Sequence, residues 1–234
     1  MTTATPETDG APPEDGAARD DAARDDAPRD SDARDAAANR KRGRGCLFEV
    51  VETVVLTVAI FLGIQTFVAQ PYQVEMTSME NTVQPGQYVL VDKLTPRWAA
   101  YGRGDIVVFE PPEAWSTVRR VPFIKRVIGL PGDTVKLVDG QVVVNGVELN
   151  EPYLYAEGDG NPEPTDPQIG GITEWVVPPG DLFVMGDHRQ ASADSRSFGP
   201  ITISSVVGRA WLRYWPPGAF GVLDRPSHPE LEAP

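Results

Sequence analysis

The stretch DTVKLVDGQVVVNGVEL, residues 133–149, decides the fold class. It contains two dipeptides, Asp139-Gly140 and Asn145-Gly146, that are typical of two-residue β-hairpin turns, because such turns need positive φ at both residues. Valines lie around both dipeptides, and β-branched residues favour strands. The stretch therefore predicts two tight hairpins in succession.

Further β-rich segments bounded by turn residues lie on both sides of this stretch. They are QYVLVDKL (87–94), DIVVFEPP (105–112), EWVVPPGDLFVMGD (174–187) and SSVVGRAWLRYW (204–215). The 23 prolines and 22 glycines supply many turns, and no long amphipathic helical pattern accompanies these strands. We therefore predict a mainly β, barrel-like domain over residues 71–223, with residues 155–172 as a long surface loop.

An apolar segment, Cys46–Gln70, precedes the β region and exceeds the roughly 20 residues that a membrane-spanning helix needs. Its length favours an uncleaved anchor over a cleaved signal peptide, whose apolar part has about 7–15 residues. The basic cluster NRKRGRG (39–45) predicts a cytoplasmic N-terminus and an extracytoplasmic β domain, in a single-pass protein of the cell membrane. Glu49 and Glu52 lie one helical turn apart, and we expect them at the lipid headgroups rather than on an ion pathway.

The two ends of the chain are poor in large apolar residues. Residues 1–39 repeat alanine, aspartate and arginine, which predicts a disordered tail, with a short helix of Asp/Arg pairs as the alternative. Together with the basic cluster they form the predicted cytoplasmic tail, residues 1–45. The segment DRPSHPELEAP, residues 224–234, is predicted to be a frayed C-terminal tail.

Charge and composition exclude several classes of function. The net charge is −13, so binding to DNA, RNA or an anionic membrane surface is not expected as the main role. With one cysteine, Cys46, neither an intrachain disulfide nor a multi-cysteine metal site can form. We expect no metal and no cofactor, and the sequence leaves the oligomeric state open.

A serine, Ser78, follows the apolar segment within the polar stretch TSMEN. A serine hydroxyl needs a base within hydrogen-bond reach to act as a nucleophile. His228 lies in the proline-rich tail, and no residue beside His188 is arranged to orient its ring, so a Ser-His-Asp triad has little support.

Lys125 is a second candidate base, because Phe123, Ile124, Val127 and Ile128 surround it in sequence. Burial among such residues disfavours the charged amine and lowers its pKa, which lets a lysine accept a proton. The alternative is an outward-facing strand residue whose amine reaches water. On the isolated strand the alternative is favoured.

The order of the motifs resembles that of bacterial type I signal peptidases. An anchor is followed by SMENTV (78–83), RGDIVVF (103–109), KRVIGLPGD (125–133) and GDHRQASADSR (186–196). The resemblance covers roughly Glu49–Leu223 and implies a Ser-Lys endopeptidase that releases exported preproteins from their signal peptides at the bilayer. It implies shallow pockets for small residues in an A-x-A-like pattern, and a substrate that adds as a strand beside the serine.

The resemblance also implies roles for single residues. Ser78 matches the nucleophile and Lys125 the general base. Ser192 matches the serine whose hydroxyl orients the lysine amine, and Asp194 and Arg196 match the pair that buttresses the site. The positions that line the substrate pockets are Val74, Val83 and Ile124.

The sequence departs from the family pattern at several positions. Asn81 stands where many members carry proline, and Met76 stands where many carry serine or glycine and offers no donor for an oxyanion. Thr77 points to the opposite face of an extended chain, which leaves the Ser78 N–H as the main donor. His188, Gln190 and Ala191 replace Asn, Asp and Asn. Only about 40 residues separate GLPGD from EWVVPPG, too few for the inserted subdomain of some members.

Two other functions remain as alternatives. A self-cleaving repressor with a Ser-Lys pair would carry a DNA-binding helical domain, and no such domain is visible before Ser78. A membrane-anchored β module that binds extracytoplasmic ligands without catalysis would make Ser78 and Lys125 incidental.

Overall fold

The structure is a computed structural model that describes residues 30–94, 98–115, 121–158 and 160–231. The predicted disordered tail lies outside the described residues up to position 29. From Asp30 onwards the backbone is helical, as in the alternative of a helix with Asp/Arg pairs rather than a disordered tail. Alanine-rich sequence favours helix, and here it extends an existing helix without a new nucleation step.

The long helix α1 spans Asp30–Phe67, and its part Phe48–Phe67 is long and apolar enough to cross a membrane. The helix ends three residues before Gln70, the predicted end of the anchor. Strand β1, Ala69–Gln73, begins two residues after the helix ends, because its backbone pairs with strand β2, Tyr88–Asp92.

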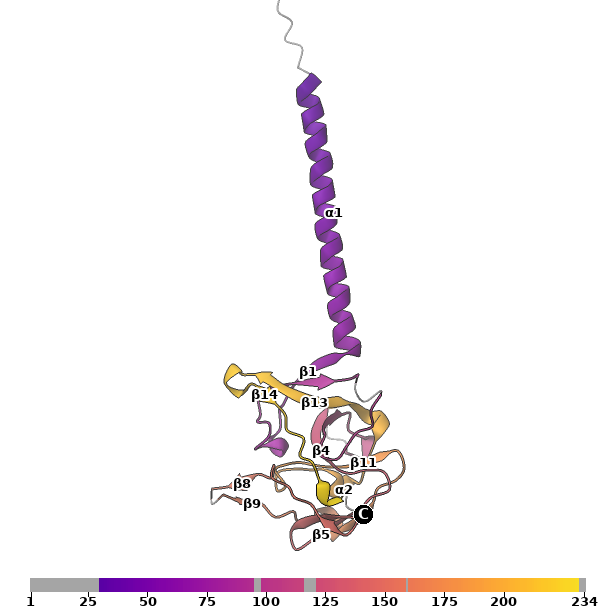
Figure 1. The fold of residues 1–234 in the computed structure, drawn as a ribbon, viewed down its shortest axis with the longest axis vertical. Helices are drawn as coiled ribbons and strands as arrows, with labels where there is room; N and C mark the ends of the chain where they lie inside the picture. Colours follow the sequence, from indigo (N-terminus) through magenta and orange to yellow (C-terminus); the bar gives the residue numbers. More distant parts are fainter. Residues whose placement is uncertain (1–29, 95–97, 116–120, 159, 232–234) are drawn as a thin grey trace, which may run out of the picture. The chain divides into compact units, whose positions relative to one another are not determined.

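The rest of the described chain consists of short strands and single helical turns, which confirms the predicted mainly β fold (Figure 1). The remaining strands are β3 Ile106–Phe109, β4 Phe123–Gly129, β5 Thr134–Val138, β6 Gln141–Val144, β7 Val147–Glu148, β8 Ala156–Glu157, β9 Asn161–Pro162, β10 Glu174–Val176, β11 Asp181–Met185, β12 Ile201–Thr202, β13 Val206–Trp215 and β14 Gly221–Val222. The helical turns are η1 Thr77–Met79, η3 Glu113–Trp115, η4 Ile169–Gly171, α2 Ser195–Phe198, η5 Ile203–Ser205, η6 Pro217–Ala219 and η7 Pro229–Leu231.

The large antiparallel sheet has the order β1-β2-β13-β3-β4-β11-β12, and β14 pairs with β13. It curls into a half-barrel (Figure 1). Within the described residues no strand pairs with the outer edge of β1, and Pro71 in that strand has no N–H to offer a neighbour. Among the described residues strand β4 pairs with β11 only from Arg126 onwards, which leaves one edge of Phe123–Lys125 unpaired there.

The predicted pair of hairpins forms the centre of a second sheet, with the order β10-β5-β6-β7. Asp139 and Gly140 have φ of 50° and 80°, and Asn145 and Gly146 have φ of 51° and 85°. Positive φ at both positions is the signature of type I′ turns, whose twist matches that of the flanking strands. The region 155–172 is less irregular than predicted, since β8 and β9 form a short hairpin within it.

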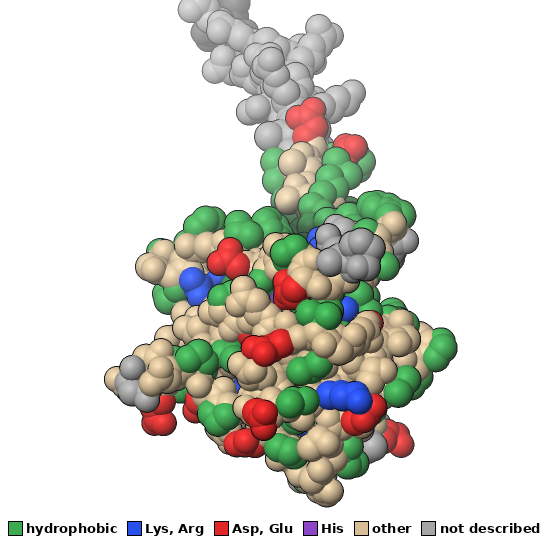
Figure 2. Space-filling model, turned by 60° about the horizontal axis from the view of Figure 1, so that its bottom comes forward, with side chains coloured by type: hydrophobic (Ala, Val, Ile, Leu, Met, Phe, Trp, Pro, Cys, Tyr) green, Lys and Arg blue, Asp and Glu red, His purple; other side chains and the backbone are tan. Residues whose placement is uncertain are grey.

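Three clusters of buried side chains hold the sheets together. One lies between β1, β2, β3 and β13 and contains Val74, Met79 and Val83. Another joins the second sheet to β11 through Phe183, and the third surrounds Phe109. On the outer surface shown in Figure 2, carboxylates are dispersed between small hydrophobic areas.

The predicted fraying of the C-terminal tail is wrong for the residues up to Leu231. His228 is buried, and Leu231 packs against the cluster that contains Phe183. The Glu230 carboxylate accepts a hydrogen bond from the Asn150 N–H. Proline-rich composition suggested disorder, but these side chains find partners on the body of the domain.

The two hairpin glycines provide a matched test of the turns. A Cβ at Gly146 would meet nothing within 4 Å, so Gly146→Ala should cost only the strain of positive φ, about 1–2 kcal/mol. A Cβ at Gly140 would lie 3.0 Å from the Pro164 Cβ, so Gly140→Ala should lower the free energy of unfolding further. Denaturant titration in detergent measures both. Equal stability of the two variants would contradict the close contact with Pro164.

Candidate active site

Ser78 and Lys125 meet in the interior of the domain, as the resemblance predicted. Ser78 lies in the single turn η1 after β1, held by the buried neighbours Val74 and Met79, and it is 3% exposed. Lys125 lies in β4 and is 1% exposed. A hydrogen bond of 2.6 Å joins Lys125 Nζ to Ser78 Oγ, and Nζ donates a second to the Ile124 carbonyl at 3.1 Å.

Burial lowers the pKa of Lys125 from its ordinary value of 10.5 to about 8. The charges of Asp194 and Asp187 act in the opposite direction and raise it, and Arg196 lowers it. Desolvation therefore exceeds the attraction of the two carboxylates. The outward-facing alternative for this lysine does not hold, because its side chain is enclosed.

A loop after β11 closes the site from the other side. Gly186 lies so close to Ser192 and to the Ser78 carbonyl that any Cβ there would collide with both. The His188 N–H donates to the Ser78 carbonyl at 3.1 Å. The loop therefore fixes the backbone of the serine directly.

Asp194, Arg196 and Ser192 form one buried network. Asp194 Oδ1 accepts from Arg196 Nε at 2.9 Å, and Asp194 Oδ2 accepts from the Gly186 N–H at 3.0 Å. Burial alone would raise the pKa of Asp194, but the hydrogen bonds and charge of Arg196 hold it below its usual value. The Ser192 hydroxyl donates to Asp194 Oδ2 at 2.7 Å, which ties it to this carboxylate.

A second ion pair supports the site, and the sequence analysis did not single it out. The Arg126 guanidinium bonds both oxygens of Asp187, at 2.9 and 2.7 Å, and is 4.0 Å from the centre of the Tyr153 ring. Thr82 donates to Asp187 Oδ2 at 2.5 Å. The sequence feature that could have indicated this pair is strand alternation. Successive side chains of a strand point to opposite faces, so Arg126 lies on the opposite face of β4 from Lys125.

Arg189, also missed, pairs with Glu151 and with the Thr165 hydroxyl in the interior. Arg189 lies in the loop after β11 and Glu151 follows β7, so this ion pair joins the two segments. Among the described residues Arg126, Arg189 and Arg196 are buried, and each has a carboxylate partner.

Asn81 shows why proline is absent from this position. Its φ is 81°, which proline cannot adopt. Its amide donates to the carbonyls of Tyr153 and Leu154, at 3.2 and 3.1 Å. Asparagine in place of the proline of many family members therefore gives up a rigid backbone and adds two side-chain hydrogen bonds.

The His188 ring is directed at carboxylates. Its Nδ1 is 2.8 Å from Glu80 Oε2, its Nε2 is 3.4 Å from Glu163 Oε1, and the ring stacks on Tyr155 at 4.1 Å. Gln190 bonds the Pro164 carbonyl and Asp166 at 2.9 Å each. These two replacements in the motif hold the loop to residues 163–166.

A narrow hollow lies between residues 72–76 and residues 121–124, next in sequence to Lys125, although neither Ser78 nor Lys125 lines it. Val74, Ile124 and Met76 line it, and its free space is about 20 Å³. That is room for one water-sized group. Val83 is buried in the same core cluster as Val74 and Ile124, but it does not line this hollow.

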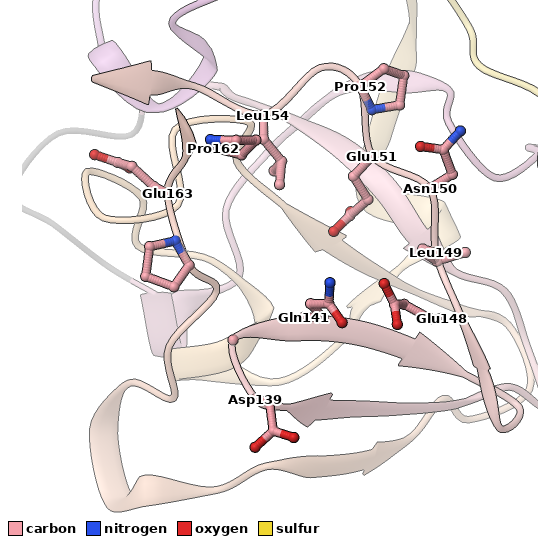
Figure 3. A pocket seen from close by; sticks show the side chains of 12 residues that line it. Asp139, Gln141, Glu148, Leu149, Asn150, Glu151, Pro152, Leu154, Pro162 and Glu163 are labelled. Atoms are coloured by element: carbon pink, nitrogen blue, oxygen red, sulfur yellow. The ribbon is translucent and has the colours of Figure 1, made fainter. Parts of the chain in front are cut away.

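A larger hollow of about 620 Å³ lies elsewhere, and neither Ser78 nor Lys125 lines it. Figure 3 shows Gln141 and Glu148, from β6 and β7, across the hollow from Glu151. Glu151 is already paired with Arg189. In the part of the chain that the structure describes, no group of three or more His, Cys, Asp or Glu side chains could hold a metal ion.

Comparisons with known proteins agree with this geometry. The family model described as "Signal peptidase, peptidase S26" matches residues 47–215. Signal peptidase I of Leptolyngbya laminosa is 36% identical over 193 residues, which cover 81% of this chain and 90% of that protein. Signal peptidase I of Bacillus licheniformis is 38% identical over 175 residues, 74% and 91% of the two chains.

A third relative, signal peptidase I of Mycobacterium tuberculosis, is 33% identical over an alignment 235 positions long, which covers 79% of this chain and 78% of that protein. The family match extends from the apolar part of α1 through β13 and includes both Ser78 and Lys125. The chain therefore belongs to the signal peptidase family, peptidase S26.

Proposed function

We propose that this membrane-anchored serine endopeptidase cleaves N-terminal signal peptides from exported preproteins, with Ser78 as nucleophile and Lys125 as general base. The observation that carries the assignment is the 2.6 Å hydrogen bond between Ser78 Oγ and a lysine amine that is enclosed in the protein. Membership of this peptidase family argues against the two alternatives, a self-cleaving repressor and a non-catalytic binding module.

In the first step the neutral Lys125 amine takes the Ser78 proton as Oγ attacks the scissile carbonyl. The lysine ammonium then gives a proton to the leaving amine as the C–N bond breaks, which leaves an acyl-enzyme. Water, activated by the same amine, hydrolyses the acyl group and regenerates Ser78. The nearby charges of Asp194 and Asp187 favour the ammonium that forms between these steps.

The supporting residues act through Lys125 and the loop after β11. Asp194 is held ionised by Arg196, and it accepts a hydrogen bond from the Ser192 hydroxyl. The Ser192 oxygen keeps lone pairs that can accept from the lysine amine and so orient it. Since Met76 offers no donor, the Ser78 N–H is the main stabiliser of the oxyanion.

The substrate binds as an extended strand between residues 73–76 and the open edge of Phe123–Lys125. Backbone pairing along open edges gives affinity, and pockets for alternate side chains give specificity. The hollow of about 20 Å³ lined by Val74 and Ile124 admits a methyl-sized side chain. This volume explains a preference for substrates with small residues before the cleavage site.

The anchor places enzyme and substrate in one bilayer. Confinement to a shared membrane raises their effective concentration without any additional contact. The basic residues before Phe48 orient the helix with its N-terminus in the cytoplasm and the catalytic domain outside.

Ser78→Ala should abolish cleavage of a preprotein with alanine before the cleavage site, because the nucleophilic oxygen is lost. The expected drop is at least about 10³-fold in kcat, above the residual rate from binding alone. Ser204→Ala, at an exposed hydroxyl, is the matched control and should keep full activity. Wild-type turnover by Ser78→Ala would refute the assignment of the nucleophile.

The rate should rise with pH through about 8, because only the neutral amine of Lys125 can accept a proton. Below that pH the lysine is an ammonium and the rate falls tenfold per pH unit. Lys125→Arg should be inactive at every accessible pH, since guanidinium stays charged. Lys136→Arg, at a half-exposed ion pair, is the control. A flat pH–rate profile between pH 6 and 10 would exclude lysine as the base.

Alkaline phosphatase fused after Pro234 should be active, because that enzyme folds only outside the cytoplasm. A fluorescent protein fused before Met1 should fluoresce in the cytoplasm. Replacing the basic residues of the cluster 39–45 by alanine should reduce the phosphatase signal by weakening the orientation. An inactive phosphatase fusion together with an intact, membrane-inserted protein would reverse the proposed topology.

A further inference from the structure

Residues Asp224–Leu231, here named the C-terminal strap, follow β14 and lie beyond the residues that the family model matches. The Leu223 N–H donates to the Trp211 carbonyl at 2.8 Å, which fixes where the strap leaves the sheet. The strap contains no strand, yet His228 within it is 6% exposed. The strap contacts residues in or next to two buried ion pairs, Arg126–Asp187 and Arg189–Glu151.

The first contact is with the turn before β3. Gly104 has φ of 83°, and a Cβ there would be 2.9 Å from the Pro226 carbonyl. The Arg225 guanidinium covers Gly102 so closely that a Cβ would overlap it. Arg225 Nε is 3.3 Å from the buried Asp105 Oδ1, which has no hydrogen-bond partner of its own. Glycines at 102 and 104 therefore leave space that the strap fills.

The second contact is with Arg126, the neighbour of Lys125 in β4. Its Nη1 donates to the Asp224 carbonyl at 3.1 Å and to the Gly104 carbonyl at 2.9 Å. The opposite edge of the same guanidinium holds Asp187 and the Thr82 hydroxyl. The strap thus holds one edge of the guanidinium whose other edge joins the loop of Ser78 to the loop after β11.

The far end of the strap is fixed near the second buried ion pair. Glu230 bonds His228 Nδ1 at 3.0 Å and the Asn150 N–H at 3.3 Å. Glu151, the next residue, pairs with Arg189 in the loop after β11. Both ends of the strap therefore reach the framework that positions the catalytic groups.

We propose that the C-terminal strap is a positioning element of catalysis: it fixes Arg126, and through Arg126 it sets the placement of Ser78 relative to Lys125. The inference rests on the proposed function of these two residues. The strap itself touches neither substrate nor reacting atoms.

Loosening the strap should lower kcat rather than raise KM, because the substrate-binding edges lie elsewhere. A displacement of about 1 Å between reacting groups costs up to about a hundredfold in rate. The rising limb of the pH–rate profile should also move to higher pH. The charge of Asp187 raises the pKa of Lys125, and a less firmly held Arg126 neutralises that charge less. Asp194 and Arg196, the other charges that face Lys125, are unchanged.

The test compares point variants of the full-length protein in detergent, on a preprotein with alanine before the cleavage site. Arg225→Ala should lower kcat about tenfold or more with KM within about twofold, and should shift the pH–rate profile to higher pH. Arg225→Lys should restore most of kcat. The matched control is Arg209→Ala, because Arg209 also pairs with Asp105, at 3.6 Å, but belongs to β13 and not to the strap.

Termination after Leu223 extends the test, with the peptide of residues 224–234 added in excess. Recovery of kcat on addition of the peptide supports the proposal. The proposal is overturned if Arg225→Ala keeps the wild-type kcat and pH profile while only Tm falls, or if Arg209→Ala loses as much activity. Wild-type turnover and its loss in Ser78→Ala, in the same assay, test the proposed function separately.

Discussion

The burial of one amine, that of Lys125, is the constraint on which the rest of the site depends. Exclusion of water lowers the pKa of a lysine towards neutral pH, and exclusion requires that the polar groups around the amine find partners within the protein. Lys125 is 1% exposed in strand β4, and the loop after β11 contacts the backbone of its partner Ser78. Ser78 lies between these two elements.

Three arginine–carboxylate pairs make that enclosure possible. Removing one partner of a buried pair leaves a charge without compensation, which typically costs about 3–5 kcal/mol. Arg126 with Asp187 and Arg189 with Glu151 join distant segments of the chain, whereas Arg196 and Asp194 lie two residues apart in one loop. The site is therefore a polar interior built from many segments, and its geometry is distributed over the fold.

Much of this organisation was predictable from the sequence. The turn dipeptides predicted the hairpins, and the motif order predicted that Ser78 and Lys125 belong to one site. The sequence did not show the strap, because the partners of Arg225 and Glu230, which are Asp105 and Asn150, lie far away in the chain. It also did not show the left-handed backbone of Asn81, because asparagine at a turn is compatible with several conformations.

Strand β1 has a consequence for which molecules can associate with this domain. Its outer edge is unpaired within the described chain, and such an edge can recruit strands from any unfolded segment nearby. Pro71 interrupts the row of donors at the middle of the strand. A strand from another chain therefore cannot form hydrogen bonds along the full edge of β1. The backbone after Gln73 remains as a short segment with which such a strand can pair. The break in this edge therefore limits strand-by-strand association with unfolded chains.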